Sequence, residues 1–151
     1  MKKFLRVMLA SVFVFFAGCD NVSVSKGGLS VVDVRMALSK DGPAVTDRKF
    51  KKDERIFVSF TVKGIKQADD DQIWIQQDLA INGPDGKPVF SKENLLDMHS
   101  KAVKGANEGT FHNDLVLPDD APVGAYEAVI KIRDKNSGGT SDTTQKFMVV
   151  E

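Results

Sequence analysis

Cysteine is almost absent from this chain of 151 residues, which contains Cys19 and no other. A single thiol excludes an intramolecular disulfide, a CxxC redox motif and a zinc site built on cysteine pairs. Tryptophan and tyrosine occur once each and histidine twice, so few of the side chains that dominate catalytic and binding sites are present. The fold must therefore be held by its apolar core, and 42% of the residues are hydrophobic.

The recurrent catalytic and cofactor motifs are also missing. The sequence contains no GxSxG, no GxGxxG or P-loop, and no HxH or HExxH spacing. His99 and His112 would need a carboxylate brought near by folding, and the acidic run at residues 68–71 lacks the spaced oxygens of a calcium loop. Asp134 and Asn136 suit a hairpin turn, although such residues also ligate calcium. We therefore expect no catalytic residue, no metal site and no cofactor.

Neither sign of charge is in excess over the whole chain, which has 21 basic and 21 acidic residues. The first 18 residues hold three basic side chains and no acidic one. From Cys19 onward, 18 basic residues face 21 acidic ones, a formal charge of about −3. Phosphate binding needs a clustered basic surface, so nucleic acid is not an expected partner. The length suits one domain.

Residues 1–18 have the three parts of an export signal. A positively charged start is followed by an apolar run at residues 5–16, which is shorter than the roughly 20 residues that a spanning helix needs. The small residues Ala17 and Gly18 come directly before Cys19. This order predicts a signal peptide over residues 1–18.

The order F-A-G-C ending at Cys19 resembles the lipobox of bacterial lipoproteins, usually written L-[AS]-[GA]-C, with Phe16 in the position of the leucine. The resemblance implies that the signal is cut between Gly18 and Cys19 and that the Cys19 thiol carries a diacylglyceryl group. It also implies acylation of the new amino terminus. Two or more acyl chains hold a protein firmly on a membrane. The alternatives are an ordinary signal peptide or an uncleaved membrane anchor.

Asp20 follows the expected lipid attachment site, and residues 19–28 read as a flexible lipidated tether ending in two glycines. In enteric-type Gram-negative bacteria, aspartate at this position resembles the signal that retains a lipoprotein in the inner membrane. The alternative is a polar linker residue without a sorting role. We expect the protein in the cell envelope, lipid-anchored to a membrane and facing the periplasm. The inner membrane is favoured over the outer one if the host is of the enteric type.

From residue 29 onward apolar and polar residues alternate, the pattern of strands with one buried face. Gln77 interrupts the apolar face of one run. Turn residues at 82–88 and 134–139 predict hairpins, and residues 91–109 are compatible with an edge strand or a short helix followed by a loop. The alternating runs are residues 32–38, 55–62, 73–81, 110–117, 126–133 and 146–150.

Residues 117–134, LPDDAPVGAYEAVIKIRD, resemble the penultimate-strand region of bacterial immunoglobulin-like domains, in which a P-x-G-x-Y turn enters a long strand. The resemblance implies that Tyr126 forms a structural corner by bonding back to upstream backbone, with Ala128 in the usual cysteine position. With the strand count, it implies an all-β fold. We expect an antiparallel immunoglobulin-like β-sandwich of about seven strands over residues 29–151, after an N-terminal signal peptide.

Three functions are compatible with this sequence. The preferred one is a non-enzymatic binding module for another envelope protein, because sandwiches bind partners through loops or by adding a strand at an open edge. Residues 91–109 with the loop at 66–72 form the expected surface. The alternative is a carbohydrate-binding module for cell-wall or surface glycan, which would need exposed aromatics in one patch, although we expect Trp74 to be buried. The third is a small envelope hydrolase.

Overall fold

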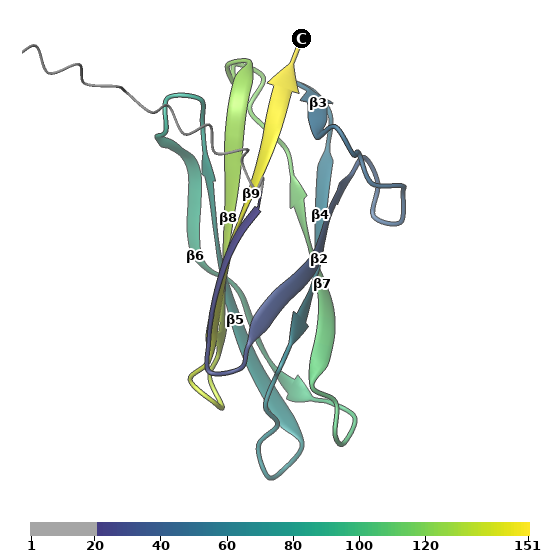
Figure 1. Cartoon of the computed structure of the whole chain (residues 1–151), viewed down its shortest axis with the longest axis vertical. Helices are drawn as coiled ribbons and strands as arrows, with labels where there is room; N and C mark the ends of the chain where they lie inside the picture. Colours follow the sequence, from purple (N-terminus) through teal and green to yellow (C-terminus); the bar gives the residue numbers. More distant parts are fainter. Residues whose placement is uncertain (1–20) are drawn as a thin grey trace, which may run out of the picture.

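The computed structural model describes residues 21–151, which form a β-sandwich of two facing sheets (Figure 1). The expected signal peptide over residues 1–18, the expected cleavage site at Gly18 and Cys19, and the expected sorting residue Asp20 lie outside the described residues. Within the described part of the chain no helix occurs, and so none that is long and apolar enough to cross a membrane. The prediction of an all-β sandwich is confirmed.

The larger sheet has the strand order β1-β9-β8-β5-β6. All of these pairs are antiparallel, whereas the short strand β3 pairs with the end of β9 in parallel. Its strands are β1 (Asn21–Lys26), β3 (Lys49–Lys51), β5 (Gln72–Asn82), β6 (Pro88–Lys101), β8 (Gly124–Asp134) and β9 (Thr140–Val150).

The smaller sheet has the order β2-β4-β7, with both pairs antiparallel. Its strands are β2 (Ser30–Ala37), β4 (Ile56–Lys63) and β7 (Glu108–Leu115). The orders β2-β4-β7 and β9-β8-β5-β6 correspond to A-B-E and G-F-C-C′ of the immunoglobulin sandwich. Among the described strands none takes the position of strand D beside β7.

The core lies between the two sheets and is built by the predicted alternation. Large apolar side chains at every second position of β4 and β8 point inward, where each removes from water an area worth about 1.5–3 kcal/mol. Seven such residues and one alanine are at most 1% exposed: Ile56, Val58, Phe60, Val62, Tyr126, Ala128, Ile130 and Ile132. The expected inward faces of these strands are confirmed.

Tyr126 closes the turn that enters β8. Its hydroxyl donates a hydrogen bond of 2.7 Å to the carbonyl of Pro122, four residues upstream, which is the contact of a tyrosine corner. The ring also stacks on Phe147 with centroids 5.5 Å apart. Burial raises the pKa of the Tyr126 hydroxyl above its ordinary value, so this group stays protonated as the donor.

Two expectations about strands need correction. The sandwich has nine strands rather than about seven, because β1 and β3 both add to the edge of β9. The flexible tether expected over residues 19–28 is wrong for Asn21–Lys26, which form β1. Its backbone hydrogen bonds are satisfied by pairing with β9 from Asn21–Gln145 to Lys26–Thr140.

Residues 91–109 contain no helix. Most of this region belongs to β6, a long edge strand that pairs with β5 along residues 88–101. Of its 14 residues only Leu96 and Met98 are partly buried. An edge strand outside the core needs no regular apolar alternation, which is why the sequence pattern was weak there.

Candidate functional site: a cleft between the two sheets

The two sheets differ in width, and this difference opens a cleft along one side of the sandwich. Among the described strands, β6 packs closely only against β5, because the smaller sheet ends at β7. A cleft of about 640 Å³ lies between the inner face of β5 and β6 on one side and β7 on the other. The volume is within the range of binding sites for drug-sized ligands.

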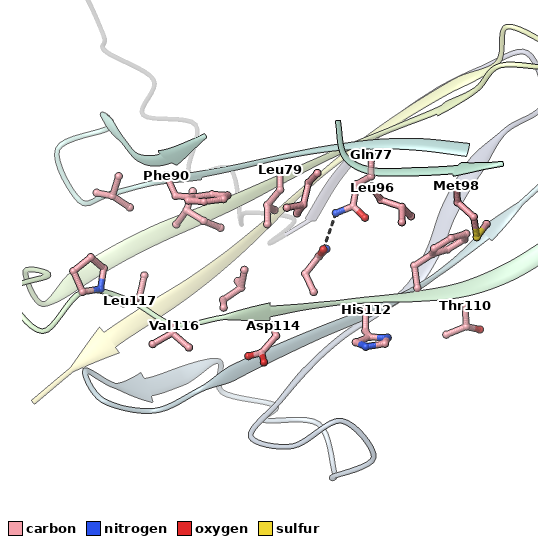
Figure 2. A pocket seen from close by; sticks show the side chains of 17 residues that line it. Gln77, Leu79, Phe90, Leu96, Met98, Thr110, His112, Asp114, Val116 and Leu117 are labelled. Carbon is pink, nitrogen blue, oxygen red and sulfur yellow. Dashed lines mark hydrogen bonds between the residues drawn. The ribbon is translucent and has the colours of Figure 1, made fainter. Parts of the chain in front are cut away.

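The cleft is lined mainly by apolar side chains (Figure 2). Buried residues of β5 form its deep part, and partly exposed residues of β6 and of the segment after β7 form its rim. The apolar lining residues are Leu79, Ile81, Val89, Phe90, Leu95, Leu96, Met98, Phe111, Leu115, Val116, Leu117 and Pro118.

One polar pair spans the deep part of the cleft. The side-chain amide of Gln77 on β5 donates a 2.8 Å hydrogen bond to the side-chain oxygen of Asn113 on β7. Both residues are buried, at 2% and 8% exposure. The Nδ2 atom of Asn113 is buried and has no hydrogen-bond partner. A buried donor without an acceptor is costly, so it is a feature that needs an explanation.

Replacing Asn113 with leucine is expected to lower the free energy of unfolding by about 1–3 kcal/mol, because the buried Gln77 amide loses its acceptor. Adding Gln77→Leu should restore most of that stability, since two apolar groups then face each other. Urea denaturation of the two single variants and the double variant measures both effects. A single Asn113→Leu variant as stable as the wild type would show that the pair does not hold the strands.

The rim of the cleft on β6 is shaped by a β-bulge of three residues. Gln77 pairs with Leu96 and Leu79 with Lys92, so the single residue Asp78 faces residues 93–95 of β6. Such an insertion bends the strand and re-aims its side chains. Leu95 and Leu96 are sequence neighbours and yet both line the cleft.

A charged cluster on the outer face of the larger sheet holds this bulge. Asp78 forms a bidentate pair with Arg133 of β8, with one N–O distance of 2.7 Å, and accepts a 2.8 Å bond from the backbone N–H of Asn94. Arg133 also donates to the side-chain oxygen of Asn94, whose φ of 49° is tolerated better by asparagine than by most residues. The cluster therefore fixes the turn of the backbone that brings Leu95 to the rim.

The hydrogen bonds from Arg133 hold the pKa of the Asp78 carboxyl below its ordinary value, although partial burial opposes this. A carboxyl whose pKa is depressed on folding stabilises the protein above its unfolded pKa, about 3.9, and this stabilisation is lost as the pH falls through the folded value. Asp78→Asn should lower the stability at pH 7 by about 1–3 kcal/mol and flatten its fall below pH 4. The urea midpoints of the wild type and the variant, measured from pH 7 to pH 2.5, test both effects. The prediction is contradicted if the midpoint of the variant falls with pH as steeply as that of the wild type.

The structure keeps the two histidines apart. His112 is exposed on β7, whereas His99 is exposed on β6 and stacks on Trp74 at 5.1 Å between ring centroids. The described residues contain no group of three side chains able to hold a metal ion. Trp74 lies half-buried on the outer face of the larger sheet, less covered than expected, and its indole donates a 2.7 Å bond to Asp97.

Sequence reasoning overlooked Asn113 and the bulge. Asn113 occupies an inward position between the apolar residues Phe111 and Leu115, just as Gln77 interrupts the apolar face of β5. The sequence signal for this pair was the presence of a polar residue at an inward-facing position on each of two strands. Their pairing across the sandwich, and the three residues opposite Asp78, depend on how the strands align, which the sequence pattern does not specify.

Comparison with known proteins identifies the fold and no family. No family model and no curated protein matches the chain. The C-terminal domain of wzt superposes with a TM-score of 0.57 at 12% identity, covering 89% of this chain and 80% of that one. A Niemann-Pick type C2 protein from the Japanese carpenter ant gives a TM-score of 0.53 at 12% identity, over 82% and 93% of the two chains.

The alkylpurine DNA glycosylase AlkC of Pseudomonas fluorescens, solved bound to DNA with an abasic-site analogue, gives a TM-score of 0.53 at 14% identity. The match covers 83% of this chain and 31% of the glycosylase, so the present protein spans under a third of that chain. At such identities the three likenesses show a shared sandwich fold and nothing about activity.

Proposed function

We propose that this protein is a lipid-anchored, non-enzymatic binding module of the cell envelope, and that the cleft between β6 and β7 holds a segment of another envelope protein. The observation that carries the proposal is an apolar cleft of about 640 Å³ that the described chain leaves open. Large apolar pockets with a few converging polar groups are the usual sites of binding.

The rim of the cleft supports a macromolecular partner. Val89, Phe90, Leu95 and Val116 line it and are 43%, 44%, 41% and 63% exposed. A cluster of exposed apolar side chains around a groove is typical of an interaction surface, since it costs solubility unless a partner covers it.

The position of the anchor leaves this surface accessible. The expected lipid on Cys19 precedes β1, and β1 lies at the edge of the larger sheet opposite to β6. Strands are spaced by about 4.8 Å, so β1 and β6 are separated by about 19 Å across the sheet. A protein attached to the membrane through Cys19 can therefore present the cleft on the side away from its tether.

The alternative functions have less support. A glycan platform uses neighbouring exposed aromatic rings, whereas Phe90 is the only exposed one among residues 22–151, and Trp74 is covered by His99. A metal-dependent hydrolase would need a metal site, and the described residues contain no group of three side chains able to hold a metal ion.

The test compares the wild type with two leucine variants in pull-downs from detergent-solubilised envelopes. Leu95→Asp places a charge at the rim, whereas Leu38→Asp is a matched control at a leucine that is 49% exposed and away from the cleft. We expect the wild type and Leu38→Asp to recover the same specific protein and Leu95→Asp to lose it. Recovery of no protein above a vector control, or equal recovery by all three, would overturn the proposal.

A further inference from the structure

The two sides of the cleft are lined in different ways. On β5 every second residue contributes, namely Gln77, Leu79 and Ile81, so this side presents side chains. On the other side nine consecutive residues, 110–118, line the cleft. Figure 2 shows the side chains of Thr110, His112 and Asp114 pointing away from β5 and β6. These residues therefore border the cleft with their backbone.

The backbone of β7 has a free edge on this side. Its eight residues pair with β4 from Ile56–Leu115 to Lys63–Glu108 without a break, and β7 has no second neighbour among the described strands. Along such an edge strand, alternate N–H and C=O groups point away from the sheet. They need water or another strand as partner.

We infer that the cleft takes an extended peptide strand, which pairs along β7 and completes the smaller sheet. The inference rests on the proposed function and names the mode of binding. A hydrocarbon chain would cover the edge of β7 and leave its polar groups without partners, which is costly. A strand satisfies those groups and directs every second side chain onto the apolar surface of β5 and β6. It occupies the place of strand D in the immunoglobulin order.

The opposite rim is unsuited to pairing. In β6 the bulge at residues 93–95 interrupts the strand, and the Asp78–Arg133–Asn94 cluster holds it. Bulges of this kind prevent edge-to-edge addition. Of the two strands that border the cleft, β7 alone offers an uninterrupted edge.

The expected amino terminus of this chain does not supply the occupant. After cleavage at the expected site only Cys19 and Asp20 precede β1, and two extended residues span about 7 Å. The β1 edge lies about 19 Å across the sheet from β6. The mature amino terminus is therefore too short to reach the cleft.

Asn113 adds no requirement on the partner sequence. It lines the cleft, but its unpaired Nδ2 is itself buried and out of reach of an occupant. The surface that an incoming strand meets on β5 and β6 is mainly apolar. The partner is thus a segment with apolar residues at alternate positions.

The test uses full-length protein in nanodiscs and a phage library of random nine-residue peptides, with palmitate as the lipid probe. We expect the selected peptides to carry apolar residues at every second position. They should slow amide hydrogen exchange in residues 108–116 of the protein. They should bind the Leu38→Asp variant but not the Leu95→Asp variant. Methylation of single amide nitrogens in the peptide should weaken binding about tenfold or more at every second amide and have little effect at the others. The reason is that only every second N–H of the peptide points toward β7.

Three results would overturn the inference in distinguishable ways. In the first result, the Leu95→Asp variant fails to bind the selected peptides, but the peptides tolerate N-methylation at every amide and leave residues 108–116 unprotected from exchange. This result would refute strand addition and leave the proposed function standing. Peptides that bind Leu95→Asp as well as the wild type would refute both. Palmitate bound in the cleft, with no peptide selected, would refute the strand and the protein partner together.

Discussion

Replacing Cys19 with alanine is expected to abolish incorporation of labelled palmitate. The thiol is the only one in the chain, so no other cysteine can accept a diacylglyceryl group. Each acyl methylene contributes about 0.8 kcal/mol of membrane affinity, so the variant loses the attachment that its acyl chains would supply. Metabolic labelling followed by immunoprecipitation measures this effect.

Asp20→Ser is the matched control for this experiment. It leaves the thiol in place and should retain the full label, while in an enteric-type host it should move the protein from the inner to the outer membrane. Incorporation of label by the Cys19→Ala variant would contradict the lipoprotein assignment. Since β1 begins at Asn21, only Asp20 separates the expected lipid attachment site from the folded domain.

Replacing Asp134 with alanine is expected to lower the free energy of unfolding by about 3 kcal/mol, the largest loss among the polar substitutions considered. Asp134 ends β8 and is 1% exposed. Its carboxylate accepts bonds from the backbone of Lys66 and Asn136, both at 2.9 Å, and from the hydroxyl of Ser137 at 2.8 Å. The substitution leaves these three donors without an acceptor at the junction of two loops.

Two comparisons make the Asp134 prediction specific. Asp134→Asn keeps one acceptor oxygen and should lose about half as much stability, whereas Asp119→Ala, at an exposed position, should change it by less than about 0.5 kcal/mol. Urea denaturation measures all three. An Asp134→Ala loss no larger than that of Asp119→Ala would show that water replaces the carboxylate. The bonds also explain why Asp134 and Asn136 stand in this turn.

Much of the sandwich follows from local patterns. Alternating apolar residues in 55–62 and 126–133 predict the inward faces of β4 and β8, since successive side chains of a strand point to opposite sides. The turn at 82–88 predicts the β5–β6 hairpin, which is closed by a bond from Gly83 N–H to Lys87 O. These features are decided within a few residues of chain.

Other elements escaped the sequence pattern because they depend on distant partners. Residues 21–26 come before two glycines and resemble part of a linker, yet they form β1 because the edge of β9 accepts their hydrogen bonds. Residues 91–101 lack clear alternation, yet they extend β6 because β5 is long enough to pair with them. Backbone groups make these contacts, so the pattern of side chains in the sequence does not reveal them.

Local sequence patterns predict that residues 29–151 are all-β, which of their side chains face the core, and where Tyr126 turns the chain into its penultimate strand. The unequal widths of the two sheets and the free edge of β7 emerge only when the described strands are assembled. That assembly also places Gln77 against Asn113 across the gap. The physical reason is that strand alternation reports burial one strand at a time. A cleft arises instead from the number of strands in each sheet, their order and their register.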